Sequence, residues 1–349
     1  MKLKVRGMAI VGLMVCLLIG LGLSSPSEAK DYITCYGSTT ADILERFAKI
    51  VDEKTGIEVR WRYHSCGEIR AKVMAEAPNF QADMVVMVCS PEMDLFKEKG
   101  WLIPYESPVS KKVVRDWGKA TPSFVKDPEN MWLVSDFWHF VLLGNKNMLK
   151  QKGYKMPESW DELLDPKWKD QIIMPSPLTS GTAFTMLYSF MTHYGFNKGK
   201  GEEGGWAYLK ALDKNINHYT RSGNAPTDLV SRGEFMLGIS GDETVIIRIR
   251  EGYPVEWKIP KEGIGYDAHY SGILKGTKKE AITRKVLDYL ASDDHAKFMA
   301  DLGYVSGSPK YPSVLYGRIP TYIPNINNKW ANDNKTRLCN EWKDKFLRK

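Results

Sequence analysis

Beyond its first 29 residues, this sequence of 349 residues has no hydrophobic run long enough to span a membrane. It contains neither the G-x-S-x-G pattern of a serine hydrolase nor the H-E-x-x-H pattern of a zinc protease. Internal repeats and low-complexity segments are also missing. The 49 basic and 42 acidic residues are interspersed, so there is no basic stripe for nucleic acid. These absences argue against a multi-span membrane protein, these two hydrolase classes and a nucleic-acid-binding protein.

Residues 1–29 have the pattern of a secretory signal peptide. Three basic residues precede an apolar run at 8–23, and a small-x-small cleavage site follows at 27–29. A membrane anchor is the competing interpretation, because the run is close to the minimum spanning length, but the cleavage site favours export. We therefore expect a periplasmic chain that starts at Lys30. Its formal net charge falls from +7 to +5 with the loss of three basic residues and Glu28, and a mildly positive field favours anionic ligands.

Apolar segments alternate with helical patterns from residue 32 onward. Strands are predicted at 32–36, 57–63 and 84–88, each followed by a helix or a polar loop. This alternation implies an α/β fold, in which a mixed, mostly parallel sheet is flanked by helices on both faces. Ligands bind such sheets outside the carboxyl ends of the strands. The polar residues that follow the three strands are therefore predicted ligand contacts: Gly37, Ser38, Thr39, Ser65, Cys66 and Ser90.

Three of the four cysteines beyond the signal peptide lie at these strand ends. They are Cys35, Cys66 and Cys89, and the fourth is Cys339. An even number of cysteines in an exported protein permits disulfides without assigning them. One interpretation is a disulfide between two of the three and a buried third thiol. The alternative is a thiolate metal site, although the C-x₂-C spacing of structural zinc sites is missing.

The segment 174–184 is predicted to be a strand end, a polar loop and a helix start. A short apolar strand precedes it, and apolar residues recur at helical spacing after it. Such a loop offers unpaired backbone N–H groups and the positive end of the helix dipole. Ser180 and Thr182 add hydroxyl groups, and Gly181 lets the backbone approach a ligand closely. Ordinary N-capping would also explain the hydroxyls, but the combination suits an anion, so these three residues are predicted to bind one.

A second α/β region starts near residue 132. Its apolar strand at 137–143 is long enough to cross between domains, and Trp138 on that strand would stack on a ligand or pack in the core. Polar loops at 221–224 and 240–244 again follow strands. They add four candidate contacts: Ser222, Asn224, Asp242 and Glu243. The two acidic side chains would pair with an ammonium group or accept from hydroxyls, or else form a solvated turn.

Several motifs resemble those of the extracellular solute-binding proteins of ABC transporters. The likeness is to the branch that includes ferric-iron, phosphonate, thiamine and sugar-phosphate binding proteins. The segments that carry it follow one another in order through nearly all of the mature chain: 82–86, 99–105, 160–169, 172–177, 180–184, 223–225, 232–234, 252–255 and 271–276. The resemblance implies a two-lobe type II periplasmic binding protein that closes about two hinge strands. Lobe 1 would take residues 30–138 plus 271–349, and lobe 2 residues 139–270.

The resemblance also bears on the ligand. Iron-binding members of this branch use a histidine and a glutamate from the first lobe and two adjacent tyrosines from the second. In this chain the tyrosine pair falls on Glu243 and Thr244, and no histidine follows Tyr36. Because ferric iron favours oxygen ligands such as phenolates, we expect that this chain does not bind iron as those members do. The loop 180–182, which cradles a phosphate or similar group in the family, is retained.

The resemblance implies a periplasmic receptor that captures a small anionic solute, phosphorylated or a phosphonate, and delivers it to ABC permease subunits in the inner membrane. We expect a monomer that uses no cofactor, performs no catalysis and binds no nucleic acid. One alternative is a receptor for iron or for a softer metal held by Cys35, Cys66 and Cys89. Another is an exported phosphate-ester hydrolase with Asp242 and Glu243 as acid and base. A sensor that docks on a signalling receptor is a third.

Overall fold

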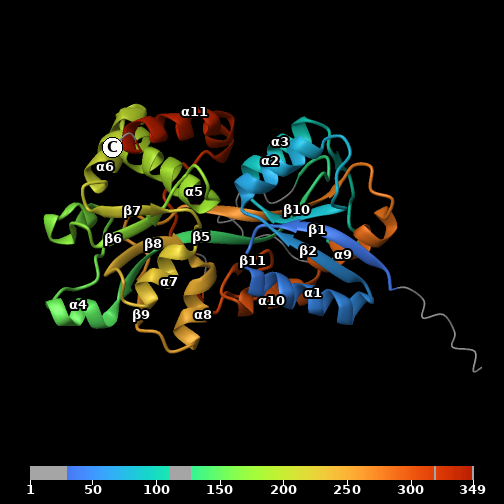
Figure 1. Ribbon diagram of the computed structural model, residues 1–349, viewed down its shortest axis with the longest axis horizontal. Helices are drawn as coiled ribbons and strands as arrows, with labels where there is room; N and C mark the ends of the chain where they lie inside the picture. Colours follow the sequence, from blue (N-terminus) through green and yellow to red (C-terminus); the bar gives the residue numbers. More distant parts are fainter. Residues whose placement is uncertain (1–29, 111–126, 318–319, 348–349) are drawn as a thin grey trace, which may run out of the picture.

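The computed structural model describes residues 30–110, 127–317 and 320–347, apart from the side chain of Glu243. The predicted signal peptide at 1–29 lies outside these residues. The described chain is an α/β fold in which helices cover the faces of one mixed sheet (Figure 1). None of the described helices is long and apolar enough to cross a membrane.

The first half of the molecule is built around three parallel strands, with β1 (Tyr32–Gly37) between β2 (Glu58–Tyr63) and β3 (Met84–Val88). Each strand leads into a helix: α1 (Ala41–Thr55), α2 (Cys66–Glu76) and α3 (Ser90–Glu98). Helix α1 is amphipathic and ends at Gly56, whose positive φ of 71° terminates it. The later elements of this half are β4 (Leu102–Ile103), α9 (Glu280–Leu290), α10 (Asp293–Asp301) and β11 (Val305–Ser306). Their apolar side chains share one buried cluster.

The second half repeats the construction. Strand β6 (Ile172–Pro175) pairs in parallel with β7 (Ile216–Thr220) and β8 (Leu237–Gly241). Strand β9 (Val255–Lys258) lies at its edge. The helices are α4 (Lys146–Lys152), α5 (Gly181–Phe190), α6 (Gly201–Leu212), α7 (Ala225–Ser231) and α8 (Val245–Arg250). A second buried cluster fills this half.

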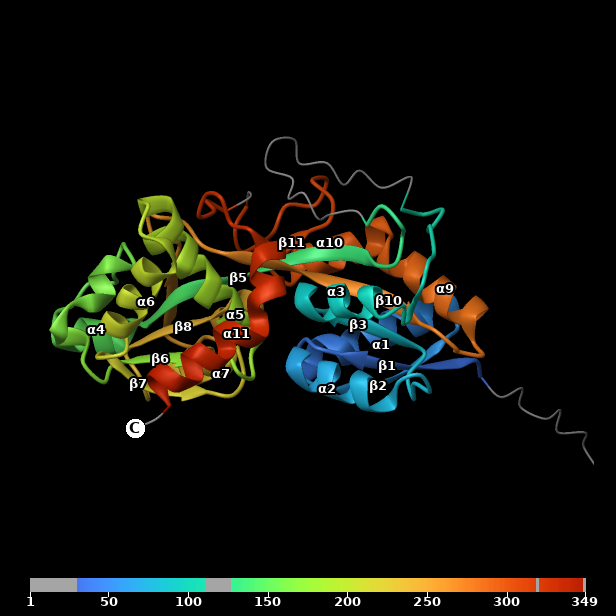
Figure 2. The same ribbon diagram turned by 90° about the horizontal axis from the view of Figure 1, so that it is seen from above.

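Two long strands connect the halves. Strand β5 (Leu133–Asn145) pairs antiparallel with β10 (Tyr266–Leu274) up to His139, and with β8 from Phe140 onward. Strand β10 in turn pairs antiparallel with β3, so the sheet order is β2-β1-β3-β10-β5-β8-β6-β7. In Figures 1 and 2, β5 and β10 run across the middle of the molecule. The carboxyl ends of the parallel strands in each half therefore point toward the boundary between the halves.

The C-terminal helix departs from the expected division of the chain. Residues 271–349 were assigned to the first lobe, but the buried side chains of α11 (Asn328–Phe346) belong to the second cluster. Trp342 and Phe346 pack there, and the Trp342 ring meets Tyr219 at 4.8 Å between centroids. The expected boundary followed the order of the chain, whereas α11 packs on α5 and meets α6 through Trp206 and Glu202, and it also contacts α3 of the first half (Figure 2).

Candidate ligand-binding site

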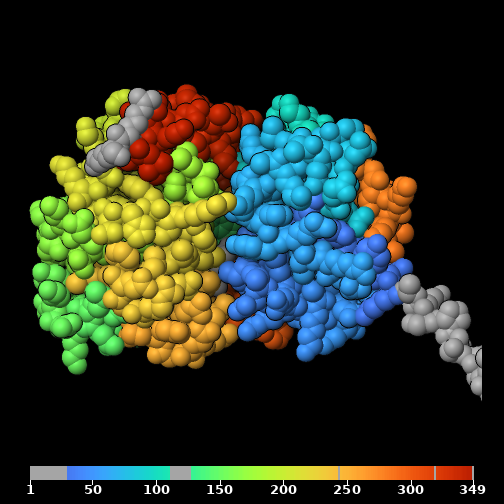
Figure 3. Space-filling view, viewed as in Figure 1, coloured from blue at the N-terminus to red at the C-terminus, as the bar shows by residue number. Residues whose placement is uncertain are grey.

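A cavity of about 300 Å³ lies at the boundary between the two halves. Figure 3 shows the boundary as a narrow hollow between the blue residues of the first half and the yellow residues of the second. Most of the predicted ligand contacts line the cavity: Ser38, Thr39, Ser65, Cys66, Trp138, Ser180, Gly181, Thr182, Ser222 and Asn224. The structure thus brings together polar loops that lie up to about 190 residues apart in the sequence, as expected from the strand-end rule.

The starts of four helices converge on this cavity. Its lining includes the N-cap residues of α2, α3 and α5, which are Ser65, Cys89 and Ser180. Thr39, which precedes the N-cap of α1, also lines it. Each helix presents unpaired N–H groups and a partial positive charge at its start. The cavity is therefore an electropositive environment even where its side chains are uncharged.

The loop 176–182 is held in place by its own backbone. The N–H groups of Thr179 and Ser180 both donate to the Ser176 carbonyl, and the Ser180 Oγ accepts from the Ala183 N–H at 3.3 Å. Ser180 therefore caps α5, and its O–H can still donate to a ligand. The Thr179 hydroxyl donates to the Arg221 carbonyl at 2.8 Å, which ties the loop 221–224 to this one.

The opposite wall contains a disulfide between Cys66 and Cys89. It joins the first residue of α2 to the N-cap of α3, so that both helix starts face the cavity. The Cys89 N–H donates to the Cys66 Sγ at 3.2 Å, and the Ser38 Oγ lies 2.9 Å from the same sulfur. Gly181 of the other half lies directly against the disulfide. The glycine was expected to admit a ligand, and the structure shows that it admits the disulfide.

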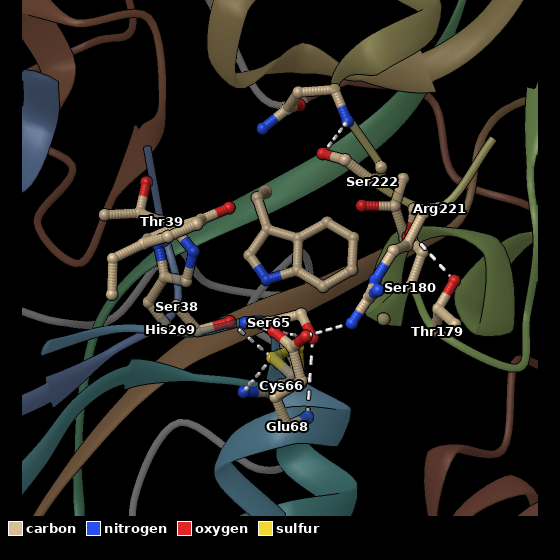
Figure 4. A pocket seen from close by; sticks show the side chains of 17 residues that line it. Ser38, Thr39, Ser65, Cys66, Glu68, Thr179, Ser180, Arg221, Ser222 and His269 are labelled. Carbon is tan, nitrogen blue, oxygen red and sulfur yellow. Dashed lines mark hydrogen bonds and ion pairs between the residues drawn. A yellow bond between two sulfur atoms is a disulfide. The ribbon is translucent and has the colours of Figure 1, made fainter. Parts of the chain in front are cut away.

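An ion pair joins the two walls of the cavity. The Arg221 guanidinium donates to the Oε1 of Glu68, and both side chains line the cavity (Figure 4). Glu68 is the acidic member of a capping box at the start of α2. Its Oε2 accepts from the Ser65 N–H at 2.9 Å and from the Ser65 Oγ at 3.0 Å. These hydrogen bonds, with that from Arg221, hold the pKa of Glu68 below its ordinary value, because they stabilise the charged form.

The floor of the cavity comes from the two connecting strands. Trp138 on β5 and His269 on β10 both line it. The His269 Nδ1 lies 2.7 Å from the Oδ1 of Asp136, and the Ser135 Oγ donates to the other carboxylate oxygen at 2.6 Å. Trp138 is buried, and its indole N–H has no hydrogen-bond partner within the described chain. A buried donor without a partner in a polar cavity indicates a place where a ligand acceptor fits.

Two predicted ligand contacts with described side chains, Ser90 and Asp242, do not line the cavity. Gly37 does not line it either, and a Cβ added at this position would meet Leu44 and Trp61. Ser90 lies on a second cavity of about 860 Å³ between α3 and the start of α11, and its N–H donates to Asp267. Asp242 is fully buried beside His139. Cys35, which was considered only for a disulfide or a metal site, is a buried free thiol.

Asp242 forms a buried network in place of a ligand contact. Its carboxylate accepts from the His139 N–H at 3.1 Å and from the Tyr316 hydroxyl at 2.8 Å, and its Oδ2 lies 2.9 Å from the His139 Nδ1. Both carboxylate oxygens are occupied by His139 or Tyr316 and Asp242 does not line the cavity, so the structure does not bring this residue together with the other predicted ligand contacts. The backbone of Glu243 lies in the short helix Asp242–Thr244, and its expected role stays a prediction.

The cysteines take the first of the two arrangements that the sequence permits. The disulfide uses Cys66 and Cys89, and burial raises the pKa of the Cys35 thiol well above its ordinary value. A metal site needs deprotonated thiolates, and neither the disulfide nor this thiol supplies them. The thiolate metal site of Cys35, Cys66 and Cys89 is therefore wrong for the disulfide-bonded protein.

Several lining residues were not predicted. They are Tyr63, Glu68, Cys89, Thr179, Arg221, Gly223 and His269, of which Cys89 had been considered for a disulfide or a metal site but not as a ligand contact. Two of them carried a usable signal. Ser65 and Glu68 form the S-x-x-E pattern of a capping box, and Arg221 is a cation beside two predicted contacts of an anion site.

Comparison with known proteins gives a consistent result. Residues 81–337 match the family described as bacterial extracellular solute-binding protein. A Salmonella typhimurium periplasmic protein, whose name proposes 2-aminoethylphosphonate as its ligand, is 26% identical over 303 residues, with 80% of each chain covered. The Synechocystis iron uptake protein A1 is 24% identical over 288 residues, covering 77% of this chain and 74% of the relative.

Solved structures give the same fold. The periplasmic binding protein AfuA from Actinobacillus pleuropneumoniae, with fructose-6-phosphate bound, superimposes with a TM-score of 0.82 at 26% identity. The match covers 92% of this chain and 100% of AfuA. Iron-bound HitA from Pseudomonas aeruginosa gives 0.71 at 18% identity, covering 89% and 99%. The architecture is that of a type II periplasmic binding protein.

Proposed function

The chain belongs to the bacterial extracellular solute-binding protein family, and we propose that, as the solute-binding component of an ABC importer, it captures a small anionic solute in the cavity between its halves. Solute-binding proteins of this family deliver small ligands to ABC permeases. The anionic character of the solute is inferred from the cavity, and its phosphate or phosphonate nature is inferred from the relatives.

The observation that carries the proposal is the convergence of four helix starts on one cavity. Helices α1, α2, α3 and α5 come from both halves, and residues at or next to their N-caps line the cavity. Several helix dipoles that point at one volume favour a negative charge there. Hydroxyl groups add neutral donors, which can bind an anion without placing further charge in the cavity.

Two of the similar proteins support a phosphonate or phosphate ligand, whereas others are iron-binding. The Salmonella relative is named for a phosphonate, and the AfuA structure holds a sugar phosphate. Both ligands carry a tetrahedral anion that could occupy the same helix starts here. The lining residues Ser180, Gly181 and Thr182 are the proposed cradle for that group, with Ser38, Thr39 and the indole N–H of Trp138 as donors from the other side.

Binding without catalysis is the expected mode of action. Family members are binding proteins, and Asp242, the acid or base of the hydrolase alternative, is committed to His139 and Tyr316 outside the cavity. The relatives are periplasmic or extracellular proteins. We propose that residues 1–29 are a cleaved signal peptide and that the mature chain is a periplasmic monomer.

Closure about β5 and β10 completes the proposal. We assign one lobe to the first cluster and the other to the second, with α11 on the second. The cavity would open as the lobes separate and enclose the solute as they approach. Affinity then comes from donors that are already fixed in position before the solute arrives.

A ligand screen with a matched pair of variants tests the proposal. Phosphate, 2-aminoethylphosphonate, fructose 6-phosphate and ferric citrate are added to the purified protein, and its melting temperature is followed. A ligand at about 100 times its dissociation constant stabilises the native state by about 2.7 kcal/mol. We expect this stabilisation from a phosphorylated or phosphonate compound, and we expect the Ser180→Ala/Thr182→Ala variant to lose it.

Ser292→Ala is the control. Ser292 caps α10 as Ser180 caps α5, accepting from the His295 N–H, but it lies outside the cavity. Both substitutions remove an N-cap, so both lower the basal stability by a similar amount, about 1 kcal/mol. Only the variant in the cavity should lose ligand stabilisation. Stabilisation by ferric citrate alone, or full stabilisation of both variants by the anionic ligands, would refute the proposed function.

A further inference from the structure

The cavity contains a carboxylate with a fixed orientation. Glu68 cannot turn away, because its Oε2 accepts two hydrogen bonds from Ser65 in the capping box while Oε1 faces the cavity. The hydrogen bonds that lower the pKa of Glu68 keep it charged at neutral pH. A permanent negative charge is thus presented to a cavity whose helix starts favour an anion. A ligand of this cavity therefore meets both a positive region at the helix starts and a fixed negative charge at Glu68.

The partner of this carboxylate belongs to the opposite wall. Arg221 follows β7, and its carbonyl accepts from the Thr179 hydroxyl, so its backbone is fixed beside the loop that would hold the anion. Its side chain crosses to Glu68 and is 77% exposed, whereas that of Glu68 is 42% exposed. Exposed ion pairs of this kind contribute little free energy. A ligand can therefore separate the pair at low cost.

A ligand anion at residues 180–182 lies next to Arg221, and a guanidinium binds phosphate-like groups strongly. When Arg221 turns to that anion, Glu68 loses its partner while still facing the cavity. A ligand that carries only negative charge then meets a like charge, which disfavours it. A ligand that also carries a protonated amine replaces the guanidinium and satisfies the carboxylate.

We infer that the solute of this cavity is a zwitterion, in which a phosphonate or phosphate group lies at the helix starts beside Arg221 and a protonated amine pairs with Glu68. Glu68 is then the residue that selects for the amine and rejects simple anions. Among the described lining residues the charges of Glu68 and Arg221 cancel, which matches a ligand with charges of both signs. The inference rests on the proposed function and narrows its ligand class.

Isosteric ligands test the inference by titration calorimetry. 2-Aminoethylphosphonate is compared with propylphosphonate, which has a methyl group in place of the ammonium group. O-phosphoethanolamine is compared with propyl phosphate in the same way. We expect the wild-type protein to bind each amine at least about tenfold more tightly than its isostere, a difference of about 1.4 kcal/mol.

The decisive variant is Glu68→Gln, which keeps the capping box, since glutamine also serves at that position, and removes the charge. It should reduce the amine preference to about onefold by weakening only the amine ligands. Glu203→Gln, an exposed residue on α6, is the matched control and should keep the preference. Equal affinity of the wild-type protein for amine and isostere, or an unchanged preference in Glu68→Gln, overturns the inference.

Two further outcomes separate this inference from the proposed function. If fructose 6-phosphate binds more tightly than either amine, Glu68 serves ligand hydroxyls, and the zwitterion is wrong while the anion site stands. If the Ser180→Ala/Thr182→Ala variant binds both amines as tightly as the wild-type protein does, residues 180–182 do not form the anion site. The inferred zwitterionic ligand, which depends on that site, is then also wrong.

Discussion

Gly181 packs against the Cys66–Cys89 disulfide so closely that a Cβ atom at residue 181 would overlap the Cys89 sulfur. The two residues belong to opposite halves, one at the start of α5 and the other at the start of α3. The three atoms nearest to that Cβ all belong to the disulfide cysteines. A residue without a side chain is therefore required here by the contact with the first half and not by packing within α5. The contact sets how closely the halves approach.

Gly181→Ala should therefore weaken ligand binding without unfolding the protein. The added methyl group is accommodated in α5, where alanine is the better helix former by about 0.5–1 kcal/mol, but it opposes the closed arrangement. Overpacking typically costs about 1–3 kcal/mol, so we expect a tenfold or greater loss of affinity by calorimetry with an unchanged or higher melting temperature. Gly67→Ala, where an added Cβ meets nothing, is the control. Wild-type affinity in Gly181→Ala would contradict a role in closure.

The disulfide itself should contribute measurably to stability. It closes a loop with a sequence separation of 23 residues, for which chain entropy suggests roughly 3 kcal/mol. A reductant should lower the free energy of unfolding of the wild-type protein by about 2–4 kcal/mol and leave a Cys66→Ser/Cys89→Ser variant unaffected. Cys339→Ser, which removes a free thiol, should respond to reductant as the wild-type protein does. Equal sensitivity of the double variant would refute this assignment.

Strand alternation was enough to predict much of the site. The rule that ligands bind beyond the carboxyl ends of parallel strands located Ser38, Ser65 and Ser180 on one cavity, because strand ends are marked locally in the sequence. The same local marks identified the starts of α2 and α5. What this reasoning could not supply is the pairing of groups that the fold brings together from distant positions.

Asp242 and Glu68 illustrate that limit. Asp242 follows a strand as the true lining residues do, but Tyr316 and His139 bury it, and neither partner is adjacent in the sequence. Glu68 meets Arg221, 153 residues away, across the cavity, and no local pattern in the sequence reveals that pairing. Tertiary packing decides whether a polar residue at a strand end faces the cavity or a buried partner. The periodicity of the sequence carries no information about that packing.

The buried carboxylate of Asp267 should make stability depend on pH. Asp267 lies on β10 and accepts from the Ser90 and Ala268 N–H groups, yet desolvation raises its pKa to about 7, with a further contribution from the charge of Glu92. The folded protein therefore holds a proton here that the unfolded chain releases near pH 4. Because the native state binds more protons in this range, this group makes stability fall as pH rises from about 4 to about 7.

The Asp267→Asn variant isolates this effect, since asparagine keeps a hydrogen-bond acceptor and does not titrate. The free energy of unfolding of both proteins is measured in urea from pH 4 to pH 8. The value for the variant minus that for the wild-type protein should increase by a few kcal/mol as pH rises and level off above about pH 7. A difference between the two proteins that is the same at every pH would mean that Asp267 is ionised throughout.

Helix α11 is joined to the first half by an ion pair between Lys335 and Glu92. Glu92 lies on α3 and is fully buried, and within the described chain its Oε2 has no hydrogen-bond partner, so the carboxylate depends on Lys335. The Lys335 ammonium also lies 5.2 Å from the Phe184 ring centre. Removing one partner of a buried pair strands the other charge, which typically costs about 3–5 kcal/mol, whereas replacing both partners with apolar groups is often neutral.

We therefore expect Lys335→Met to lower the free energy of unfolding in urea by about 3–5 kcal/mol, and Lys335→Met/Glu92→Met to recover most of that loss. Lys329→Met, which breaks the exposed pair of Lys329 with Asp333 on the same helix, should cost less than about 1 kcal/mol. If the double variant were as unstable as Lys335→Met, the loss would come from the missing contact between the ammonium group and the Phe184 ring and not from the stranded carboxylate. Recovery in the double variant would instead show that the loss in Lys335→Met comes from the stranded Glu92 carboxylate, so that the pair of α11 and α3 requires matched charges while adding little net stability of its own.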